Sequence, residues 1–343
     1  MKTQILDLHD LDNPLIQQEL KRKLTQGSLV IFPTETVYGI GGYACLEEAA
    51  QSIYAVKGRP SDNPLIVHLA RFDQIERYAY IDHPDVYTLA KAFWPGPMTL
   101  VLRKNDTIPM SVTGGLSTIA IRIPSHPVAR TLLEVTNLPL AAPSANLSGK
   151  PSSTTFAHVM SDFNGKVEVI IDGGDVPIGL ESTVIDMTQD IPSILRPGSI
   201  TQVMIEQVLK RPVLDESDLK NGGIPKSPGM KYKHYAPLAE MTLVRGNPDA
   251  VIAFLKEESL RNQGLAIIGP TEIVSHLNQS SIIDLGSLSD LNTIGKNLFS
   301  SFRQLDELHV NRAYIVALSD EGLGKAIMNR VLKAVNHHVI DVD

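Results

Sequence analysis

Ser28-Leu-Val-Ile-Phe32, followed by Leu46-Glu-Glu-Ala-Ala-Gln-Ser-Ile-Tyr-Ala-Val-Lys57, decides the fold class. The first stretch is a short apolar run typical of a buried strand, and the second has apolar residues at helical spacing before Gly58 and Pro60. The alternation continues, with strands predicted at 65–69, 98–102, 118–123, 167–172 and 182–187. Further helices are predicted at 82–94, 127–135 and 201–209. The pattern indicates an α/β fold.

Composition narrows the class of protein. A chain of 343 residues with 43% hydrophobic and 20% charged residues is globular and long enough for two domains. Its net charge of -7 disfavours a broad nucleic-acid surface. The single cysteine, Cys45, excludes an intramolecular disulfide and a multi-cysteine zinc site. There is neither a signal-peptide pattern nor a membrane-length apolar run, so we expect a cytoplasmic protein.

The alternation of predicted strands and helices is interrupted once, by a segment rich in proline and glycine at residues 211–237. This interruption predicts that the chain is divided into three parts. We expect a first α/β domain over residues 1–210, an ordered but non-repetitive linker over 211–237 and a second domain over 238–343. The linker alone is net basic, and it contains the cluster Lys231-Tyr-Lys-His-Tyr235, which suits an anionic, ring-bearing ligand. In the second domain, strands are predicted at 241–244, 265–268, 282–285 and 313–317, and helices at 248–257, 289–307 and 324–335. This rhythm indicates a small Rossmann-like α/β unit.

Polar residues mark the ends of the predicted strands. Thr34 and Thr36 follow the first strand, where α/β sheets bind ligands, although a simple turn is an equal alternative. Lys57 and Arg59 flank a helix stop and suggest an anion site, which Asn63 and His68 follow. For His68 taken alone, a hydrogen-bonded core histidine is the favoured interpretation.

Arg122 lies among apolar residues of a strand, where a cation requires an anionic partner, either a structural carboxylate or a ligand. The loop from Ala141 to Thr155 is rich in hydroxyls and opens a helix, which suits phosphate binding. Ser182 and Arg196 add another hydroxyl and another cation beside strands.

Motifs that would indicate other classes of enzyme are absent or occur in the wrong context. The glycine run from Gly39 to Ala44 fits a dinucleotide fingerprint, but it does not follow its strand directly. A P-loop and a G-x-S-x-G elbow are absent from the sequence, and Cys45 is more typical of a small core residue than of a nucleophile.

Five ordered motifs together resemble the YrdC-like threonylcarbamoyl-AMP synthases, in their long two-domain form. These motifs are Lys57-x-Arg-Pro-x-x-x-Pro-Leu, Ser144-Ala-Asn-x-Ser-Gly-x-Pro-Ser-x-Thr-Thr, Glu181-Ser-Thr-Val, Arg196-Pro-Gly and Ser227-Pro-Gly-Met-Lys-Tyr-x-His-Tyr-Ala-Pro237. The resemblance covers essentially the whole chain. It implies a twisted, mixed, open sheet with flanking helices in a catalytic domain over residues 1–210, a lid over the active site formed by the linker 211–237, and an accessory domain over 238–343. Lys233 stands where the family commonly has arginine, so we assign it no phosphate contact.

The resemblance implies a nucleotidyltransferase that converts L-threonine, bicarbonate and ATP, with Mg²⁺, into threonylcarbamoyl-AMP and pyrophosphate. The product would pass to a separate transferase complex that modifies tRNA, and any direct contact with tRNA would be weak. The implied threonine pocket comprises Thr36, His68, Arg122, Ala142 and Ser182. The implied ATP contacts are Arg59, Asn63, Thr118, Ser144, Ser152, Arg196 and Tyr235, and the implied catalytic residues are Lys57, beside the phosphates, and Arg59. No metal-ligating residue is assigned.

Two other functions are compatible with parts of the sequence. A noncatalytic RNA-binding module could use the same basic residues, although the acidic net charge disfavours it. A carbamoyltransferase-type YrdC-like enzyme normally carries zinc-finger cysteines, which a chain with one cysteine lacks. The sequence leaves open the role of the C-terminal domain, the oligomeric state and the selectivity for the amino acid.

Overall fold

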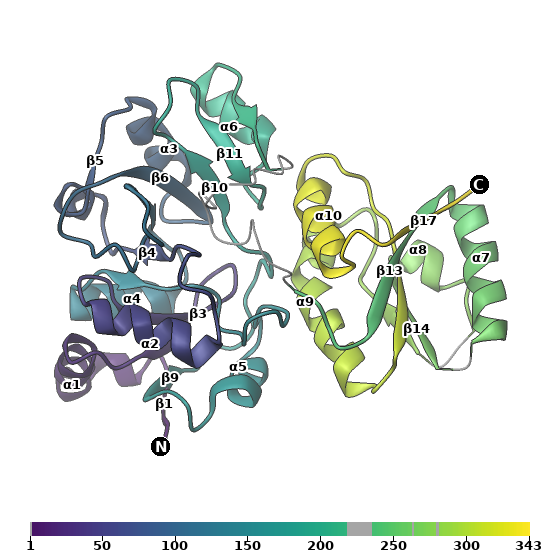
Figure 1. Ribbon diagram of the computed structural model, residues 1–343, viewed down its shortest axis with the longest axis horizontal. Helices are drawn as coiled ribbons and strands as arrows, with labels where there is room; N and C mark the ends of the chain where they lie inside the picture. Colours follow the sequence, from purple (N-terminus) through teal and green to yellow (C-terminus); the bar gives the residue numbers. More distant parts are fainter. Residues whose placement is uncertain (1, 218–234, 263, 279–280) are drawn as a thin grey trace. The chain divides into compact units, whose positions relative to one another are not determined.

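The described part of the chain forms two compact units (Figure 1). A computed structural model describes residues 2–217, 235–262, 264–278 and 281–343. The first unit takes the described residues within Met1–Ser148, Ser153–Pro177 and Glu181–Lys231, and the second takes those within Gly149–Ser152, Ile178–Leu180 and Tyr232–Asp343. The predicted lid falls largely on residues 218–234, which lie outside the described residues. The limits at residues 210 and 238 therefore stay a prediction.

The first unit is built on a mixed sheet with the order β1-β9-β2-β3-β8-β4-β7-β6-β10-β11-β12, to which β5 adds beside β6. Its strands are β1 (Gln4–Leu6), β2 (Val30–Pro33), β3 (Tyr38–Tyr43), β4 (Ile66–His68), β5 (Ala79–Tyr80), β6 (Met98–Lys104), β7 (Thr118–Arg122), β8 (Leu140–Ala141), β9 (Val169–Ile171), β10 (Thr183–Asp186), β11 (Ser193–Arg196) and β12 (Leu214–Asp215). Each strand predicted for this unit is present. This mixed α/β architecture confirms the predicted fold class.

Helices cover both faces of this sheet. They are α1 (Pro14–Thr25), α2 (Glu47–Lys57), α3 (Asp85–Phe93), α4 (Pro127–Thr136), α5 (Phe156–Phe163) and α6 (Gln202–Leu209), with short 3-10 helices at Asp10–Asp12 and Phe72–Arg77. Successive side chains of β2 point to opposite faces. Ile31 accordingly packs in the cluster that holds Ile53 of α2, and Phe32 in the cluster that holds Leu24 of α1 and Leu132 of α4. Burial on both faces explains why this strand reads as a continuous apolar run.

Helix α1 and the short strands β1, β5, β8, β11 and β12 were not predicted from the sequence. Strand β3 was not predicted either, because glycines at 39, 41 and 42 lower strand propensity. It pairs antiparallel with β2, from Pro33 opposite Tyr38 to Val30 opposite Gly41. The close approach of the Phe32 ring requires glycine at position 41, since a Cβ there would lie 2.8 Å from Phe32 Cε1. The glycine run therefore serves packing within a strand.

The second unit is a parallel α/β sheet with the order β15-β14-β16-β13-β17, which confirms a Rossmann-like unit. Its elements are β13 (Glu240–Gly246), α7 (Pro248–Arg261), β14 (Leu265–Gly269), α8 (Thr271–Val274), β15 (Ile282–Asp284), α9 (Leu291–Glu307), β16 (Arg312–Val316), α10 (Leu323–Ala334) and β17 (Val339–Val342). Within this unit, α9 and α10 lie on one side of the sheet and α7 and α8 on the other (Figure 1). Among the helices that the structure describes, none is long and apolar enough to cross a membrane.

Gly41→Ala should lower the free energy of unfolding of the first unit by about 1–3 kcal/mol, because the added methyl group overpacks the buried Phe32 ring. Gly39→Ala, in the same strand, is the matched control. A Cβ at position 39 makes only ordinary contacts, the nearest at 3.5 Å, so its effect should be clearly smaller. Urea denaturation followed by the fluorescence of Trp94, the single tryptophan of the chain, measures both. Equal destabilisation by the two variants would contradict this packing argument.

Candidate active site

Neighbouring strands of the first sheet place three nitrogen-bearing side chains along one edge. His68, at the end of β4, lies opposite Arg122, at the end of the parallel strand β7. Arg196, at the end of β11, lies opposite Val184 of β10. Strands β6 and β10 lie between β7 and β11 and begin where these two strands end. Since directly opposite residues share a face of a sheet, these side chains form one row.

A second row, two residues back along the strands, is apolar. Ile66 lies opposite Ala120 on the same face as His68 and Arg122. These two belong to a small buried cluster, separate from the main core, that consists of Ile66, Val101, Ala120, Val184 and Leu195. Thr118, two residues before Ala120, follows on this face. This face of the sheet therefore has the polar row at one edge and this apolar cluster, the apolar floor, next to it. Thr118 lies on the far side of the apolar floor from Arg122.

The guanidinium of Arg122 is held from three directions. Its Nη2 lies 2.8 Å from Glu35 Oε1, out of line for a hydrogen bond, and its Nη1 donates to Thr36 Oγ1 at 2.8 Å. Its Nε donates to the carbonyl of Gly96 at 3.3 Å. Arg122 is only 3% exposed and Glu35 only 5%. The buried guanidinium is thus neutralised by the Glu35 carboxylate. It has five N–H donors, and those of Nη2 make no hydrogen bond to a described residue, so they can bind a second acceptor.

Sequence reasoning singled out the threonines of this turn and missed Glu35. Glu35 Oε2 also accepts from the Ser125 backbone N–H at 3.0 Å, and Thr34 Oγ1 lies 2.8 Å from Thr36 Oγ1. Two features of the sequence could have indicated this ion pair. Glu35 lies in a Thr-Glu-Thr turn directly after a strand, and Arg122 lies inside another strand, where it needs an anionic partner.

The buried pair sets the protonation states around it. Burial raises the pKa of Glu35, but the Arg122 guanidinium outweighs this and leaves that pKa below its ordinary value. Burial, and then the positive charge of Arg122, lowers the pKa of His68 to about 3. His68 is therefore neutral at physiological pH. Its Nδ1 lies 3.1 Å from the carbonyl of Ile66, which assigns the proton to Nδ1.

Ser182, which immediately precedes β10, is hydrogen-bonded to Arg196, so a residue predicted to bind threonine contacts one predicted to bind ATP. The Ser182 hydroxyl lies 2.7 Å from Thr99 Oγ1 and accepts from Arg196 Nη2 at 3.1 Å. Arg196 Nε also donates to the Ser182 carbonyl at 3.0 Å. All three side chains are at least 95% buried, so the Arg196 side chain is fixed at this edge of the sheet.

Lys57, the last residue of α2, binds the hydroxyl-rich loop. Its ammonium donates to the carbonyl of Ser144 and, at 2.6 Å, to the carbonyl of Asn146, while Ser144 Oγ donates to Asn146 Oδ1 at 2.6 Å. The Ser148 backbone N–H donates back to the Lys57 carbonyl at 2.8 Å. In this structure, Lys57 orders the loop that carries Ser144.

Arg59 and Asn63 lie in the turn before β4. Arg59 Nη2 donates to the carbonyls of Asn63 and Pro64 at 3.4 and 3.3 Å. The side chain of Asn63 is 1% exposed, yet neither atom of its carboxamide has a hydrogen-bond partner among the described residues. A buried amide without partners costs free energy, and a bound ligand would satisfy it.

The remaining predicted residues divide between the two units. Ala142 lies beside the row, where its backbone N–H donates to the carbonyl of Ile66 at 2.8 Å. Ser152 and Tyr235 belong to the second unit, in which the Tyr235 ring stacks on Phe299 with centroids 5.0 Å apart. The linker residues Lys231 to His234, with Lys233 among them, lie outside the described residues.

Comparisons with known proteins agree with this architecture. A family described as "Telomere recombination" (Sua5/YciO/YrdC) matches residues 22–198, and "Threonylcarbamoyl-AMP synthase, C-terminal domain" matches residues 200–335. A threonylcarbamoyl-AMP synthase of Pyrococcus abyssi is 44% identical over 93% of this chain and 94% of its own length. The Bacillus subtilis protein of the same name is 42% identical over 92% of both chains. The crystal structure of P. abyssi Sua5 complexed with L-threonine superposes with a TM-score of 0.90, at 40% identity, and covers 99% of this chain and 100% of that chain.

The mixed sheet with its buried row of His68, Arg122 and Arg196 defines a YrdC-like α/β protein, here joined to a second, parallel α/β unit. The chain belongs to the threonylcarbamoyl-AMP synthase family, in the two-domain form. The resemblance found from the five sequence motifs is confirmed.

The low pKa of His68 predicts a pH-dependent stability. In the unfolded chain this imidazole takes up a proton below about pH 6.5, whereas in the folded protein it does not until about pH 3. The free energy of unfolding should therefore fall below pH 6.5, with His68 contributing a slope of about 1.4 kcal/mol per pH unit. Urea denaturation at intervals between pH 7.5 and 5, compared for the wild type and His68→Gln, measures this contribution. An unchanged slope in the variant would show that His68 is not buried in its neutral form.

Proposed function

We propose that this protein makes threonylcarbamoyl-AMP and pyrophosphate from L-threonine, bicarbonate and ATP, by nucleotidyl transfer. The names of its relatives and the threonine-bound P. abyssi structure support this activity. The observation that carries the proposal is the buried Arg122, whose fork retains donors beside the neutral His68. A fixed cation next to an uncharged ring suits a zwitterionic amino acid.

The threonine end of the site would be the polar row. Arg122 would bind the carboxylate with its free N–H groups, and the Thr36 hydroxyl would orient the guanidinium. The neutral His68 adds no repulsion to the substrate ammonium group and can bond a polar group of the amino acid. Ala142 and Ser182 would complete the pocket, where the small methyl group leaves room and the hydroxyl supplies a further polar contact.

The nucleotide end would be the edge at which β4 and β7 begin. Thr118 lies four residues before Arg122 on one strand, which separates them by about 13 Å. That length suits an adenylate that extends from threonine at one edge, over the apolar floor, to the nucleotide at the other. Arg59, Asn63, Thr118 and Ser144 would contact ATP at this end, and Arg196 would contact it from the row that carries Arg122. The family resemblance also assigns Ser152 and Tyr235, which belong to the second unit, to ATP.

The mechanism requires no protein nucleophile. The threonine amine and bicarbonate condense to a carbamate, in a step in which a C–N bond forms and a C–O bond breaks with loss of water. A carbamate oxygen then attacks the α-phosphorus of ATP; one P–O bond forms, another breaks, and pyrophosphate leaves with the electron pair. Catalysis is then positioning plus electrostatic stabilisation by cations such as Arg59. Lys57 would contribute by holding the Ser144 loop and by its charge beside the phosphates. Burial raises the pKa of the Cys45 thiol, which suits a packing role for this residue.

Mg²⁺ would accompany ATP as part of the substrate and neutralise phosphate charge. Across the residues searched, there is no group of three His, Cys, Asp or Glu side chains that could hold a metal ion. This donor set suits a Mg²⁺ that the phosphates and water carry into the site, since the ion commonly keeps several waters.

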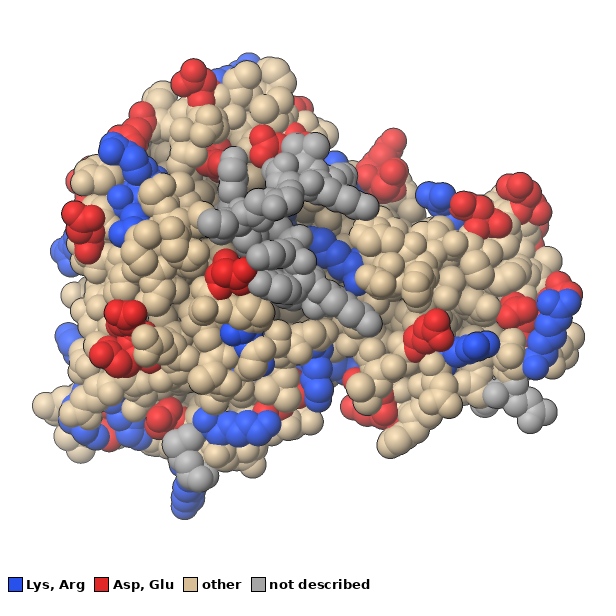
Figure 2. All heavy atoms as spheres, viewed as in Figure 1, with Lys and Arg blue, Asp and Glu red and all other residues tan. Residues whose placement is uncertain are grey.

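The product would be consumed by a separate tRNA-modifying transferase, because an adenylate is an activated acyl donor. On the face drawn in Figure 2, acidic and basic side chains are interspersed over the described residues. Interspersed charge supports an enzyme for small substrates over a noncatalytic RNA-binding module.

Pyrophosphate release from ATP should depend on both L-threonine and bicarbonate in the presence of Mg²⁺. Thr36→Val should raise KM for threonine about tenfold and leave KM for ATP nearly unchanged, because it removes one hydrogen bond at the threonine end. Arg261→Gln, at an exposed position of α7, is a control that should change neither constant. The absence of threonine-dependent turnover by the wild-type protein would refute the proposed function.

Asn63→Leu should affect the free energy of unfolding and the KM for ATP differently. Replacement of a buried, unpartnered carboxamide by an apolar group of similar size should leave the free energy of unfolding unchanged or raise it by about 1 kcal/mol. The same change should raise KM for ATP, because the ligand loses its hydrogen bonds to the carboxamide. Denaturation curves and ATP saturation curves on the one variant test both parts. A destabilised variant with normal KM for ATP would assign Asn63 a structural role.

A further inference from the structure

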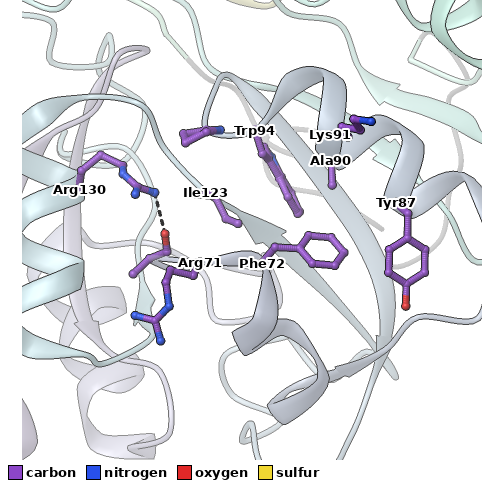
Figure 3. Close-up of a pocket in the computed structure, with 10 residues that line it drawn as sticks. Arg71, Phe72, Tyr87, Ala90, Lys91, Trp94, Ile123 and Arg130 are labelled. Atoms are coloured by element: carbon purple, nitrogen blue, oxygen red, sulfur yellow. Dashed lines mark hydrogen bonds between the residues drawn. The ribbon is translucent and has the colours of Figure 1, made fainter.

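A pocket of about 490 Å³ opens in the first unit and shares no lining residue with the proposed threonine and ATP contacts (Figure 3). Three of its walls are segments that adjoin the active-site strands: residues 70–72 after β4, residues 94–95 before β6, and Ile123 after β7. Helices α3 and α4 complete it. The volume lies within the range of small-molecule sites, which is about 300–1,000 Å³.

One side of the pocket is aromatic. The rings of Phe72 and Trp94 have centroids 6.4 Å apart, and Tyr87 lies 5.4 Å from Phe72 on its other side. The indole N–H of Trp94 donates to the carbonyl of Met98 at 2.7 Å, so its polar group is already satisfied within the fold. The ring faces therefore offer apolar, stacking surface.

Three cationic side chains line the pocket, Arg71, Lys91 and Arg130. Figure 3 shows the guanidinium of Arg130 directed toward the side of the pocket that carries Trp94, whereas the guanidinium of Arg71 points away from the aromatic rings. Lys91, on α3, adds a third positive charge. Asp73 and Glu134, which do not line the pocket, pair with the two arginines at 3.1 and 2.6 Å. Such surface pairs contribute little free energy, so Arg130 can still bind an anion, and the half-exposed Arg71 side chain can turn toward one.

The walls are fixed without a ligand. Arg130 Nη1 donates to the carbonyl of Ala70 at 2.6 Å, which joins α4 to the segment after β4. The Gly96 backbone N–H donates to the carbonyl of Ile123 at 2.8 Å, which joins the Trp94 segment to the end of β7. A preformed cavity binds a ligand at a lower entropic cost than one that must be ordered first.

We propose that this pocket is a second ligand site, for a ring-bearing phosphate of the size of a purine nucleoside monophosphate. The base stacks against Trp94 and Phe72, with the Arg130 plane available for cation–π contact, and the phosphate is neutralised by Arg71, Lys91 and Arg130. The same chemistry is presented by a free nucleotide and by an unpaired nucleotide of an RNA. Binding here requires no catalytic turnover, so its test is independent of the proposed activity.

The single tryptophan makes the pocket directly observable, because Trp94 lines it. The full-length protein, with L-threonine and a non-hydrolysable ATP analogue at saturation, is titrated with AMP while its fluorescence is recorded. A saturable change is expected, with adenosine and inorganic phosphate each binding at least about tenfold more weakly, since each retains only half of the recognised chemistry. Tighter, salt-dependent binding of a short oligoadenylate would identify RNA as the source, and equal binding would identify the free nucleotide.

Variants connect the signal to the pocket. Arg71→Gln and Lys91→Gln should each weaken AMP binding several-fold while pyrophosphate release stays normal, and Arg22→Gln, an exposed change on α1, should leave binding unaltered. Equilibrium dialysis with labelled AMP gives a second measurement that does not depend on fluorescence. No saturable AMP binding, or binding that both pocket variants retain in full, would overturn the proposal. The first outcome is also the one expected if an acidic protein partner occupies the pocket.

Discussion

The burial of one guanidinium group constrains the rest of the first unit. Arg122 ends a strand inside the sheet, and a cation in that position is tolerated only with an anion and aligned acceptors around it. Glu35 and Thr36 supply these from the turn after β2, and the Gly96 carbonyl supplies another from the segment before β6. Loss of either charge would leave its partner buried and uncompensated, at a cost of about 3–5 kcal/mol. Three segments that are distant in sequence are thereby held at one edge of the sheet.

The same pair determines the electrostatics of the proposed reaction. The positive charge of Arg122 adds to burial in keeping His68 neutral, while Glu35 stays ionised although it is buried. Around Arg122, the edge of the sheet therefore offers a compensated cation beside an uncharged imidazole, which suits a zwitterionic amino acid, and Arg196 lies farther along the same row. In the proposed function, the nucleotide lies toward the other end of β4 and β7, near Asn63 and Thr118. The amino acid and most of the nucleotide contacts would thus lie at different ends of one continuous face.

Much of the fold could be predicted from local pattern, and the exceptions have physical causes. Strands such as 65–69 and 118–123 were predicted because they are buried on both faces and read as apolar runs. Strand β3 was missed because glycine has a low strand propensity. Glycine at position 41 is needed to make room for the Phe32 ring of the neighbouring strand, and this contact cannot be inferred from local propensity. Glu35 was missed for a similar reason, since its role depends on an arginine 87 positions later in the chain. The pocket beside Trp94 unites three segments with no shared motif, so no sequence pattern could indicate it.

The sequence by itself determined the α/β class, the two-part organisation suggested by the break after residue 210, and the family, because these depend on periodicity and on motifs of fixed spacing. Only the tertiary structure decided what Arg122 pairs with, which way Lys57 directs its ammonium, and that Asn63 is buried without a partner. These properties depend on distances between side chains that strand register and turn geometry bring together. Residue type states which interactions a side chain can make, and the fold decides which of them it does make.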